Sequence, residues 1–313
     1  MKQVDFNEEV DFNEEVDFNE EVDFNKEVEL NKEVAFQNLV ITVVGLGLIG
    51  GSMAMALKKL GPRKIWGVDI DREVLRKAEK TKVIDGGFTE GASVLPTSDL
   101  VIICLYPSEI GGFIRKNMPF FKPNAVLTDI GGLKQSIISE IRHCLRPDLD
   151  FVGGHPLAGR EGSGFAQATA EIWQGANYIL TPAGARKESV LLLEKMIKGL
   201  GCHAVIYMDP EEHDRIIALT SHLPHVVAAA LMTSNYLANP EKFIGGSFRD
   251  ATRVAVMNVN LWSELLLENK DNVLRQIDIF LHKISKIKQA LQKQDATALK
   301  HILEKANASR RLL

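Results

Sequence analysis

The feature that most constrains this fold is a short β-branched strand that runs directly into a glycine-rich turn and a helix. The strand is LVITVVG, residues 39–45, and the helical stretch GLIGGSMAMALKKLG ends at Gly61 and Pro62. Helical segments then alternate with further apolar runs, at residues 64–70, 99–107, 125–132, 178–182 and 203–209. Such alternation is typical of a parallel α/β sheet, so we predict an α/β domain over residues 39–208.

The chain changes character after Pro210, where strand-like runs no longer occur. Residues 211–237, 258–292 and 295–308 all have helical spacing. We therefore predict that residues 209–313 form a separate, all-helical domain.

The N-terminus differs from both of these regions. Residues 1–38 carry a six-residue repeat, VDFNEE and its variants, which we predict to be a disordered acidic tail. Residues 1–39 hold 3 Lys and 13 acidic residues, whereas the rest of the chain holds 34 basic and 28 acidic residues. This mildly basic body suits a small anionic molecule, and no basic run is long enough to indicate nucleic acid.

The glycine-rich turn has the spacing G-x-G-x-x-G, formed by Gly45, Gly47 and Gly50 around Leu48 and Ile49. After a strand and at the start of a helix, this spacing marks the dinucleotide-binding loop of a Rossmann-type domain. The helix N-terminus offers unpaired N–H groups and a partial positive charge to phosphates. We predict that these five residues bind a dinucleotide cofactor.

Asp69 ends the next predicted strand, 24 residues after Gly45. A carboxylate at this point accepts hydrogen bonds from the adenosine ribose and repels a 2′-phosphate, which favours NAD over NADP. Arg72 keeps NADP as an alternative. The other role for Asp69 is a helix N-cap, for which Asp71 is better placed.

A second glycine-rich stretch, FVGGHPLAGREGSG at residues 151–164, contains a single histidine, His155. Glycine and proline disfavour a helix by about 1 and about 3 kcal/mol per residue, so we predict a loop after the strand-like DFV. In α/β sheets such loops line the ligand crevice. A neutral histidine there can act as a general base, although a lone histidine is more often bonded locally.

Two polar clusters fall in the predicted helical domain. In SHLPH, His222 and His225 share one helical face around a proline that would kink the helix. In FRDATR, Arg249 and Arg253 also share one face and can clamp a carboxylate by bidentate hydrogen bonds. A solvated charged face explains FRDATR equally well, and SHLPH offers no third metal ligand. We take all four residues as substrate-site candidates and predict no metal.

Cysteine usage and hydropathy indicate the cellular environment. Cys104, Cys144 and Cys202 are far apart and form no metal-binding pattern, so a reducing cytoplasm is the simplest setting. The sequence contains no run of 18 apolar residues and no signal-peptide pattern. We predict a cytoplasmic protein without a membrane segment.

Six segments of this sequence, taken in chain order, resemble the prephenate dehydrogenase family, including its arogenate and cyclohexadienyl members. They are VVGLGLIGGS, VDI, LTDIGGLK, GGHPLAG, SHLPHVVAAAL and FRDATR. The resemblance runs from about residue 39 to the C-terminus, and the last three segments are its most specific part. It implies NAD-dependent oxidative decarboxylation of prephenate to 4-hydroxyphenylpyruvate in tyrosine biosynthesis. It also implies that the helical domain builds a homodimer.

The resemblance implies roles for individual residues. His155, in the GGHP segment, would hydrogen-bond the ring hydroxyl of the substrate. His225 would line the substrate site, and Arg253 would bind a substrate carboxylate. Glu161 is carried over more weakly, as a polar gate.

One position departs from the family pattern. Members commonly read D-x-G-S-x-K where this chain reads DIGGLK, so Gly132 replaces a serine whose hydroxyl orients the catalytic histidine and contacts substrate and nicotinamide. Arogenate dehydrogenase is therefore the main alternative function. A β-hydroxyacid dehydrogenase, which would want a catalytic lysine in its helical domain, and a non-catalytic NAD sensor are the others.

Overall fold

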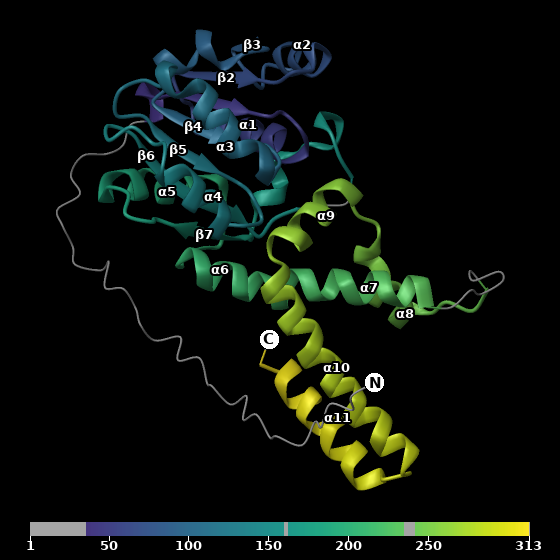
Figure 1. The fold of residues 1–313 in the computed structure, drawn as a ribbon. Helices are drawn as coiled ribbons and strands as arrows, with labels where there is room; N and C mark the ends of the chain where they lie inside the picture. Colours follow the sequence, from purple (N-terminus) through teal and green to yellow (C-terminus); the bar gives the residue numbers. More distant parts are fainter. Residues whose placement is uncertain (1–35, 160–161, 235–241, 313) are drawn as a thin grey trace. The chain divides into compact units, whose positions relative to one another are not determined.

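The computed structural model describes residues 36–159, 162–234 and 242–312 (Figure 1). The predicted acidic tail lies outside these residues, except for its last three, which form the 3₁₀ turn η1 (Phe36–Asn38). The Rossmann-type sheet predicted from the sequence is confirmed. Its strand order in the described residues is β3-β2-β1-β4-β5-β6-β7-β8, and every neighbouring pair is parallel except β6 and β7. The strands are β1 (Val40–Val44), β2 (Lys64–Val68), β3 (Gly86–Phe88), β4 (Leu100–Ile103), β5 (Val126–Asp129), β6 (Asp150–Pro156), β7 (Asn177–Thr181) and β8 (Ala204–Tyr207).

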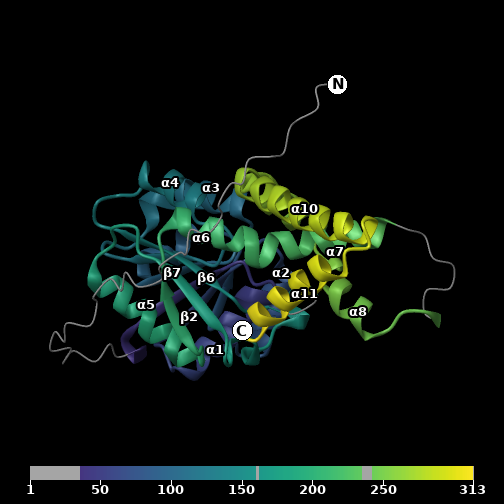
Figure 2. The same cartoon turned by 90° about the horizontal axis from the view of Figure 1, so that it is seen from below.

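Helices cover both faces of the sheet, as Figure 2 shows for α1 and α5 on one side and α3 and α4 on the other. Leu100 and Ile102 of β4 pack with the α1 and α5 side, whereas Val101 and Ile103 pack with the α3 and α4 side. A parallel sheet buried on both faces needs such uninterrupted apolar strands, which explains why they were recognisable. The helices are α1 (Leu48–Lys59), α2 (Arg72–Lys80), α3 (Pro107–Asn117), α4 (Gln135–Arg142) and α5 (Lys187–Leu200).

His155 lies in strand β6 and not in the loop that the glycine content predicts, so that prediction was wrong. The backbone of β6 pairs with β5 up to Val152 and with β7 from Gly153 to Pro156. These two ladders outweigh the poor strand propensity of glycine and proline. Pro156, which has no N–H to donate to the ladder, is the last residue of the strand.

The all-helical C-terminal region is also confirmed. α6 (Pro210–Ile217), the π-helical turn η7 (Ala218–His222) and α7 (Leu223–Ser234) form one continuous helix. α10 and α11 lie side by side as an antiparallel pair (Figure 1). The remaining elements are α8 (Gly246–Thr252), the 3₁₀ turn η9 (Arg253–Ala255), α9 (Val259–Glu268), α10 (Lys270–Gln292) and α11 (Ala296–Arg310).

A π turn precedes Pro224, at which the sequence predicts a kink. Proline lacks an N–H and its ring crowds the carbonyl four residues earlier, so the regular helix cannot continue unchanged. The N–H of Leu223 instead donates to the carbonyl of Ala218, five residues back. Such π turns are frequent at functional sites.

Within the described residues, the helix Pro210–Ser234 is long and apolar enough to cross a membrane, by length and composition only. Its polar residues His213, Asp214 and His222 are almost fully buried. Each hydrogen-bonds a residue outside the helix: His155, Lys134 and Asn269 respectively. These bonds tie the N-terminal half of the helix to neighbouring elements, whereas only 22% of its most apolar 18-residue window is buried.

We expect Trp173→Ala to lower the free energy of unfolding by about 3–5 kcal/mol, because it leaves a large cavity. Trp173 is fully buried, and its Nε1–H donates to the carbonyl of Ser52 in α1 at 3.1 Å. Urea titration at fixed protein concentration measures the loss. The control is Trp66→Ala, at a half-buried ring, which should cost clearly less. Equal losses in the two variants would contradict this account of the core.

Candidate active site

Four parallel strands bring their carboxyl ends to one edge of the sheet. These are β1, β4, β5 and β6. The glycine loop follows β1, Gly132 follows β5, and His155 lies near the end of β6. In open α/β sheets this edge is where ligands bind.

The glycine loop is shaped by steric limits at two positions. Gly45 has a φ of +82°, and a Cβ there would lie 2.4 Å from the carbonyl oxygen of Cys104. A Cβ at Gly50 would lie 1.8 Å from the carbonyl oxygen of Gly45. Both positions therefore require glycine.

Gly47 has the opposite environment. It is the N-cap of α1 without a side-chain cap, and no described atom lies within 4 Å of where its Cβ would be. Leu48 and Ile49 follow as the first residues of α1, where backbone N–H groups have no partner within the helix. This combination of open space and unpaired donors fits the pyrophosphate of a dinucleotide.

Asp69 connects the glycine loop to the end of β2. Its Oδ2 accepts from the N–H of Leu46 at 2.7 Å, and its Oδ1 accepts from the N–H of Asp71 at 2.8 Å. Each carboxylate oxygen has a further lone pair, which can accept from a ribose hydroxyl. Asp71 is the N-cap of α2, accepting from the N–H groups of Glu73 and Val74, so capping does not need Asp69.

His155 is one end of a hydrogen-bonded chain of side chains. Its Nδ1 lies 2.8 Å from Nε2 of His213, and Nδ1 of His213 lies 2.7 Å from Oδ1 of Asp214. Its other ring nitrogen, Nε2, lies 4.0 Å from the position of a Cβ on Gly132. The sequence reasoning missed His213 and Asp214, whose only signal is a histidine–aspartate pair in the first turns of a predicted helix.

Asp214 is held in place by the loop between β5 and α4. It accepts from the backbone N–H groups of Lys134 at 2.8 Å and Gln135 at 3.0 Å. Its own carbonyl accepts from Nδ2 of Asn269 at 2.8 Å. Asp214 therefore joins the sheet loop to helices α6 and α9–α10.

A second buried carboxylate, Asp129, organises the same loop. It accepts from the N–H groups of Gly131 and Gly154 and from Nζ of Lys134. Asp129 and Lys134 are both fully buried and form an ion pair at 2.5 Å. Burial lowers the pKa of Lys134, and the charge of Asp129 opposes that shift.

The histidines of this cluster are neutral. Burial lowers the pKa of His155 well below its usual value, and the nearby His213, Lys134 and His222 lower it further. Burial also lowers the pKa of His213, against the hydrogen bond to Asp214 that raises it. Burial lowers the pKa of His222 to about 4. Near pH 7 the His155 ring is therefore unprotonated at one of its two nitrogens.

His222 and His225 share one side of the helix, as predicted, and both contact Trp262 of α9. His225 stacks on the Trp262 ring with centroids 3.5 Å apart, and His222 meets that ring edge-on at 5.9 Å. Nδ1 of His222 also lies 3.3 Å from Nδ2 of Asn269. Trp262 was missed because a tryptophan in a helical stretch carries no signal beyond that of core packing.

Arg249 and Arg253 do not lie on one regular helix, contrary to prediction. α8 ends at Thr252, whose hydroxyl donates back to the carbonyl of Phe248, and Arg253 begins the 3₁₀ turn η9. The turn η9, which Arg253 begins, packs against α7, which carries His225. Burial lowers the pKa of His225, its bond to the Ser221 carbonyl opposes that shift, and the charge of Arg253 adds to it. Arg249 is exposed on α8, and Glu161 lies outside the described residues.

Comparison with known proteins gives matches over almost the whole described chain. The profile of the prephenate dehydrogenase nucleotide-binding domain matches residues 53–206, and that of the prephenate dehydrogenase dimerization domain matches residues 209–305. Prephenate dehydrogenase of Bacillus subtilis is 36% identical over 276 residues, which cover 83% of this chain and 72% of that protein. Cyclohexadienyl dehydrogenase of Zymomonas mobilis is 32% identical over 277 residues, covering 86% and 94%.

A solved structure agrees with these matches. The prephenate dehydrogenase from A. aeolicus, in complex with hydroxyphenyl propionate and NAD+, has a TM-score of 0.80 and 32% identity to this chain. The match covers 87% of this chain and 97% of that structure.

The open position of Gly47 yields a test of the cofactor loop. We expect Gly47→Ala to leave the thermal midpoint unchanged, because the fold has room for a Cβ there. The same methyl group would occupy the space that a pyrophosphate approaches, so the Kd for NAD should rise about tenfold or more, at least about 1.4 kcal/mol. The matched control is Gly112→Ala in α3, which also has open space and should bind NAD normally. Unchanged NAD affinity in Gly47→Ala would place the pyrophosphate elsewhere.

Proposed function

This chain belongs to the prephenate dehydrogenase family, and we propose that the residues gathered around His155 carry out its reaction. The chain is an NAD-dependent oxidoreductase that converts prephenate to 4-hydroxyphenylpyruvate with loss of carbon dioxide, a step of tyrosine biosynthesis. The observation that carries our assignment is the neutral His155 at the carboxyl edge of the sheet, with one ring nitrogen tied to His213.

The cofactor assignment rests on the fit of the loop. The N–H groups of Leu48 and Ile49 would hold the pyrophosphate beside Gly47, and Asp69 would hold the adenosine ribose. When bound, NAD accepts the hydride from the carbon that bears the substrate hydroxyl. Asp69 would repel a 2′-phosphate, which favours NAD over NADP.

His155 acts on the hydroxyl proton. As the hydride leaves, the O–H bond breaks and the proton moves to Nε2 of His155, so the oxygen becomes a carbonyl. The bond to the ring carboxylate then breaks, its electron pair enters the ring, and carbon dioxide departs. The ring becomes aromatic, and the proton on His155 returns to the phenolate oxygen. The reaction needs no separate acid and releases no net proton.

The substrate is a dianion and needs positive charge. We assign Arg253 to a substrate carboxylate, because a guanidinium forms bidentate bonds with such a group and η9, which Arg253 begins, packs against α7, which carries His225. His225, stacked on Trp262, would line the substrate site. We give His222 a supporting position behind His225, and Arg249 a place at the exposed rim. Glu161 remains a prediction from the resemblance.

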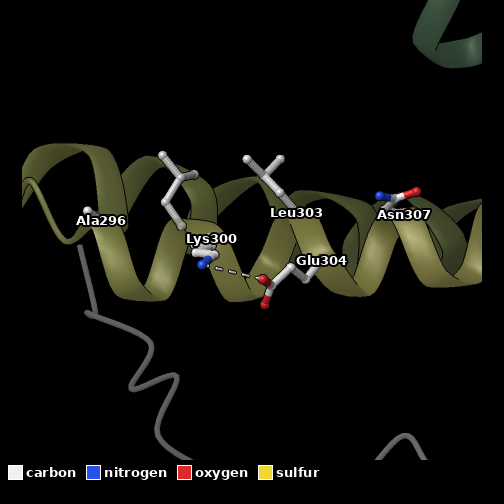
Figure 3. Close-up of a pocket in the computed structure, with 6 residues that line it drawn as sticks. Ala296, Lys300, Leu303, Glu304 and Asn307 are labelled. Atoms are coloured by element: carbon white, nitrogen blue, oxygen red, sulfur yellow. Dashed lines mark ion pairs between the residues drawn. The ribbon is translucent and has the colours of Figure 1, made fainter.

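We further infer two domains, residues 39–208 and 209–313, and a homodimer formed through the second. The support is the match of residues 209–305 to a dimerization domain, together with exposed apolar side chains on α10 and α11. These are Leu274, Leu281, Ile284, Leu291 and Leu303. A surface hollow on α11 is lined by Ala296, Leu299, Lys300, Leu303, Glu304 and Asn307 (Figure 3). An apolar surface of this kind is typical of an interface between subunits.

We also infer a cytoplasmic location. The three cysteines are free thiols in the structure, as expected in a reducing compartment.

Replacement of His155 tests the assigned reaction. We expect His155→Asn to lower kcat for prephenate by roughly 10²-fold or more, since asparagine cannot take the hydroxyl proton. NADH formation followed by absorbance gives kcat, and calorimetry should give an unchanged Kd for NAD. Because the pKa of His155 is lowered, its base form persists as pH falls, and the acid limb of wild-type kcat should lie below pH 6.5.

The same assay discriminates between the functions. Wild-type protein should reduce NAD with prephenate and not with a β-hydroxyacid. Turnover of arogenate in preference to prephenate would establish the alternative function. If His155→Asn kept its kcat and lost only NAD affinity, our role for His155 would be wrong.

The position of the family serine gives a further test. Gly132 does not have a positive φ, and a Cβ there would meet Cδ2 of Leu265 at 3.3 Å, so a small side chain needs only a slight shift of Leu265. We expect Gly132→Ser to raise kcat/KM for prephenate about five- to tenfold, because a hydroxyl beside Nε2 of His155 adds a neutral hydrogen bond. Steady-state assays on prephenate and arogenate measure the change.

Gly132→Ala is the matched control, because it adds the Cβ without the hydroxyl. It should not reproduce the gain. If both variants fold, bind NAD and are slower on both substrates, the loop has been rebuilt around glycine.

A further inference from the structure

We propose that His213 and Asp214 are positioning residues that fix the tautomer of His155 and stabilise its protonated form during turnover. The proposal rests on the function proposed for His155. Neither residue was recognisable from the sequence, and neither touches the reacting atoms in our mechanism. They act through the hydrogen-bonded chain that ends at Nδ1 of His155.

The direction of each hydrogen bond follows from the groups involved. The backbone N–H groups of Lys134 and Gln135 donate to the Asp214 carboxylate, and Nδ1 of His213 lies 2.7 Å from its Oδ1. An ionised carboxylate accepts and cannot donate. Nδ1 of His213 must therefore carry the hydrogen. In a neutral ring the other nitrogen then has only a lone pair, so Nε2 of His213 accepts from Nδ1–H of His155. The remaining nitrogen, Nε2 of His155, is left without a hydrogen.

The hydrogen-bonded series His155–His213–Asp214 is held in place by its surroundings. His213 is fully buried and Asp214 is 4% exposed, so neither ring nor carboxylate can turn freely to water. Asp214 is bonded both to the loop that carries Gly132 and to Asn269. The position of the His155 ring is thereby tied to the loop that borders its free nitrogen.

The same hydrogen-bonded series stabilises the positive charge that forms on His155. When the hydroxyl proton reaches Nε2, the ring becomes a cation in a buried place that also holds the charged Lys134. The bond from Nδ1–H to His213 strengthens as the donor becomes charged. Asp214, one ring further on, supplies the balancing negative charge, whereas Asp129 is already paired with Lys134. Burial lowers the pKa of His222 to about 4, so His222 adds no positive charge beside His155 near pH 7.

The experiment compares His213→Leu and His213→Gln, each in the wild-type chain and in the His155→Asn background. Leucine fills the buried space but offers no acceptor, whereas glutamine offers an oxygen acceptor. We expect His213→Leu to lower kcat for prephenate about 10- to 100-fold, with KM and the Kd for NAD within about twofold. His213→Gln should recover most of the lost kcat. The control is Thr42→Val, which removes another buried hydrogen bond, to Ser98, and should keep kcat.

The double variants separate positioning from packing. If His213 acts through His155, replacing it should add little further loss of kcat once His155 is asparagine. Equal proportional losses in both backgrounds, or wild-type kcat in His213→Leu, would overturn the proposal. If His213→Leu does not fold, Asp214→Asn in the same cycle decides it by the same criterion. A wild-type chain that turned over neither prephenate nor arogenate would overturn the proposed function, and this inference with it.

Discussion

The hydrogen bond between His155 and His213 is the interaction on which the candidate site depends. It joins the last residues of a sheet strand to the first helix of the C-terminal region, so neither region holds the site alone. Through His213 it reaches Asp214, which receives N–H groups from the loop after β5. The geometry of the base is therefore set by the packing of α6 against the sheet edge.

Two buried carboxylates have different roles at this edge of the sheet. Asp129 pairs with Lys134 and orders the backbone around Gly131 and Gly154, whereas Asp214 anchors the two histidines. Removing a buried charge from water is unfavourable unless hydrogen bonds and opposite charge compensate, and both carboxylates have several donors. A site built in this way keeps histidines neutral and prepared to receive a proton, while Lys134 is held away from that role by its own partner.

The sequence was most informative where local chemistry decides structure. The buried parallel strands, the glycine loop and the cap at Asp71 were all recognisable, because apolar runs, steric limits and N–H capping act within a few residues. The local preference of glycine predicts a loop at His155. Strand pairing with β7, which is distant in sequence, outweighs that preference, so His155 lies in β6. His213 and Asp214 escaped notice because their importance comes from contacts to residues 155 and 134. Arg249 lies in α8 and Arg253 in the 3₁₀ turn that follows, a boundary that helical spacing does not fix.

The protonation state of His155 is the central claim, and ring nitrogen NMR tests it most directly. In protein labelled with ¹⁵N at histidine, with His155→Asn used for assignment, the account predicts a neutral His155 near pH 7. Its Nδ1 should carry the hydrogen and couple to the ring of His213, and its Nε2 should have the shift of an unprotonated nitrogen. A hydrogen on Nε2, or an imidazolium at that pH, would contradict the account.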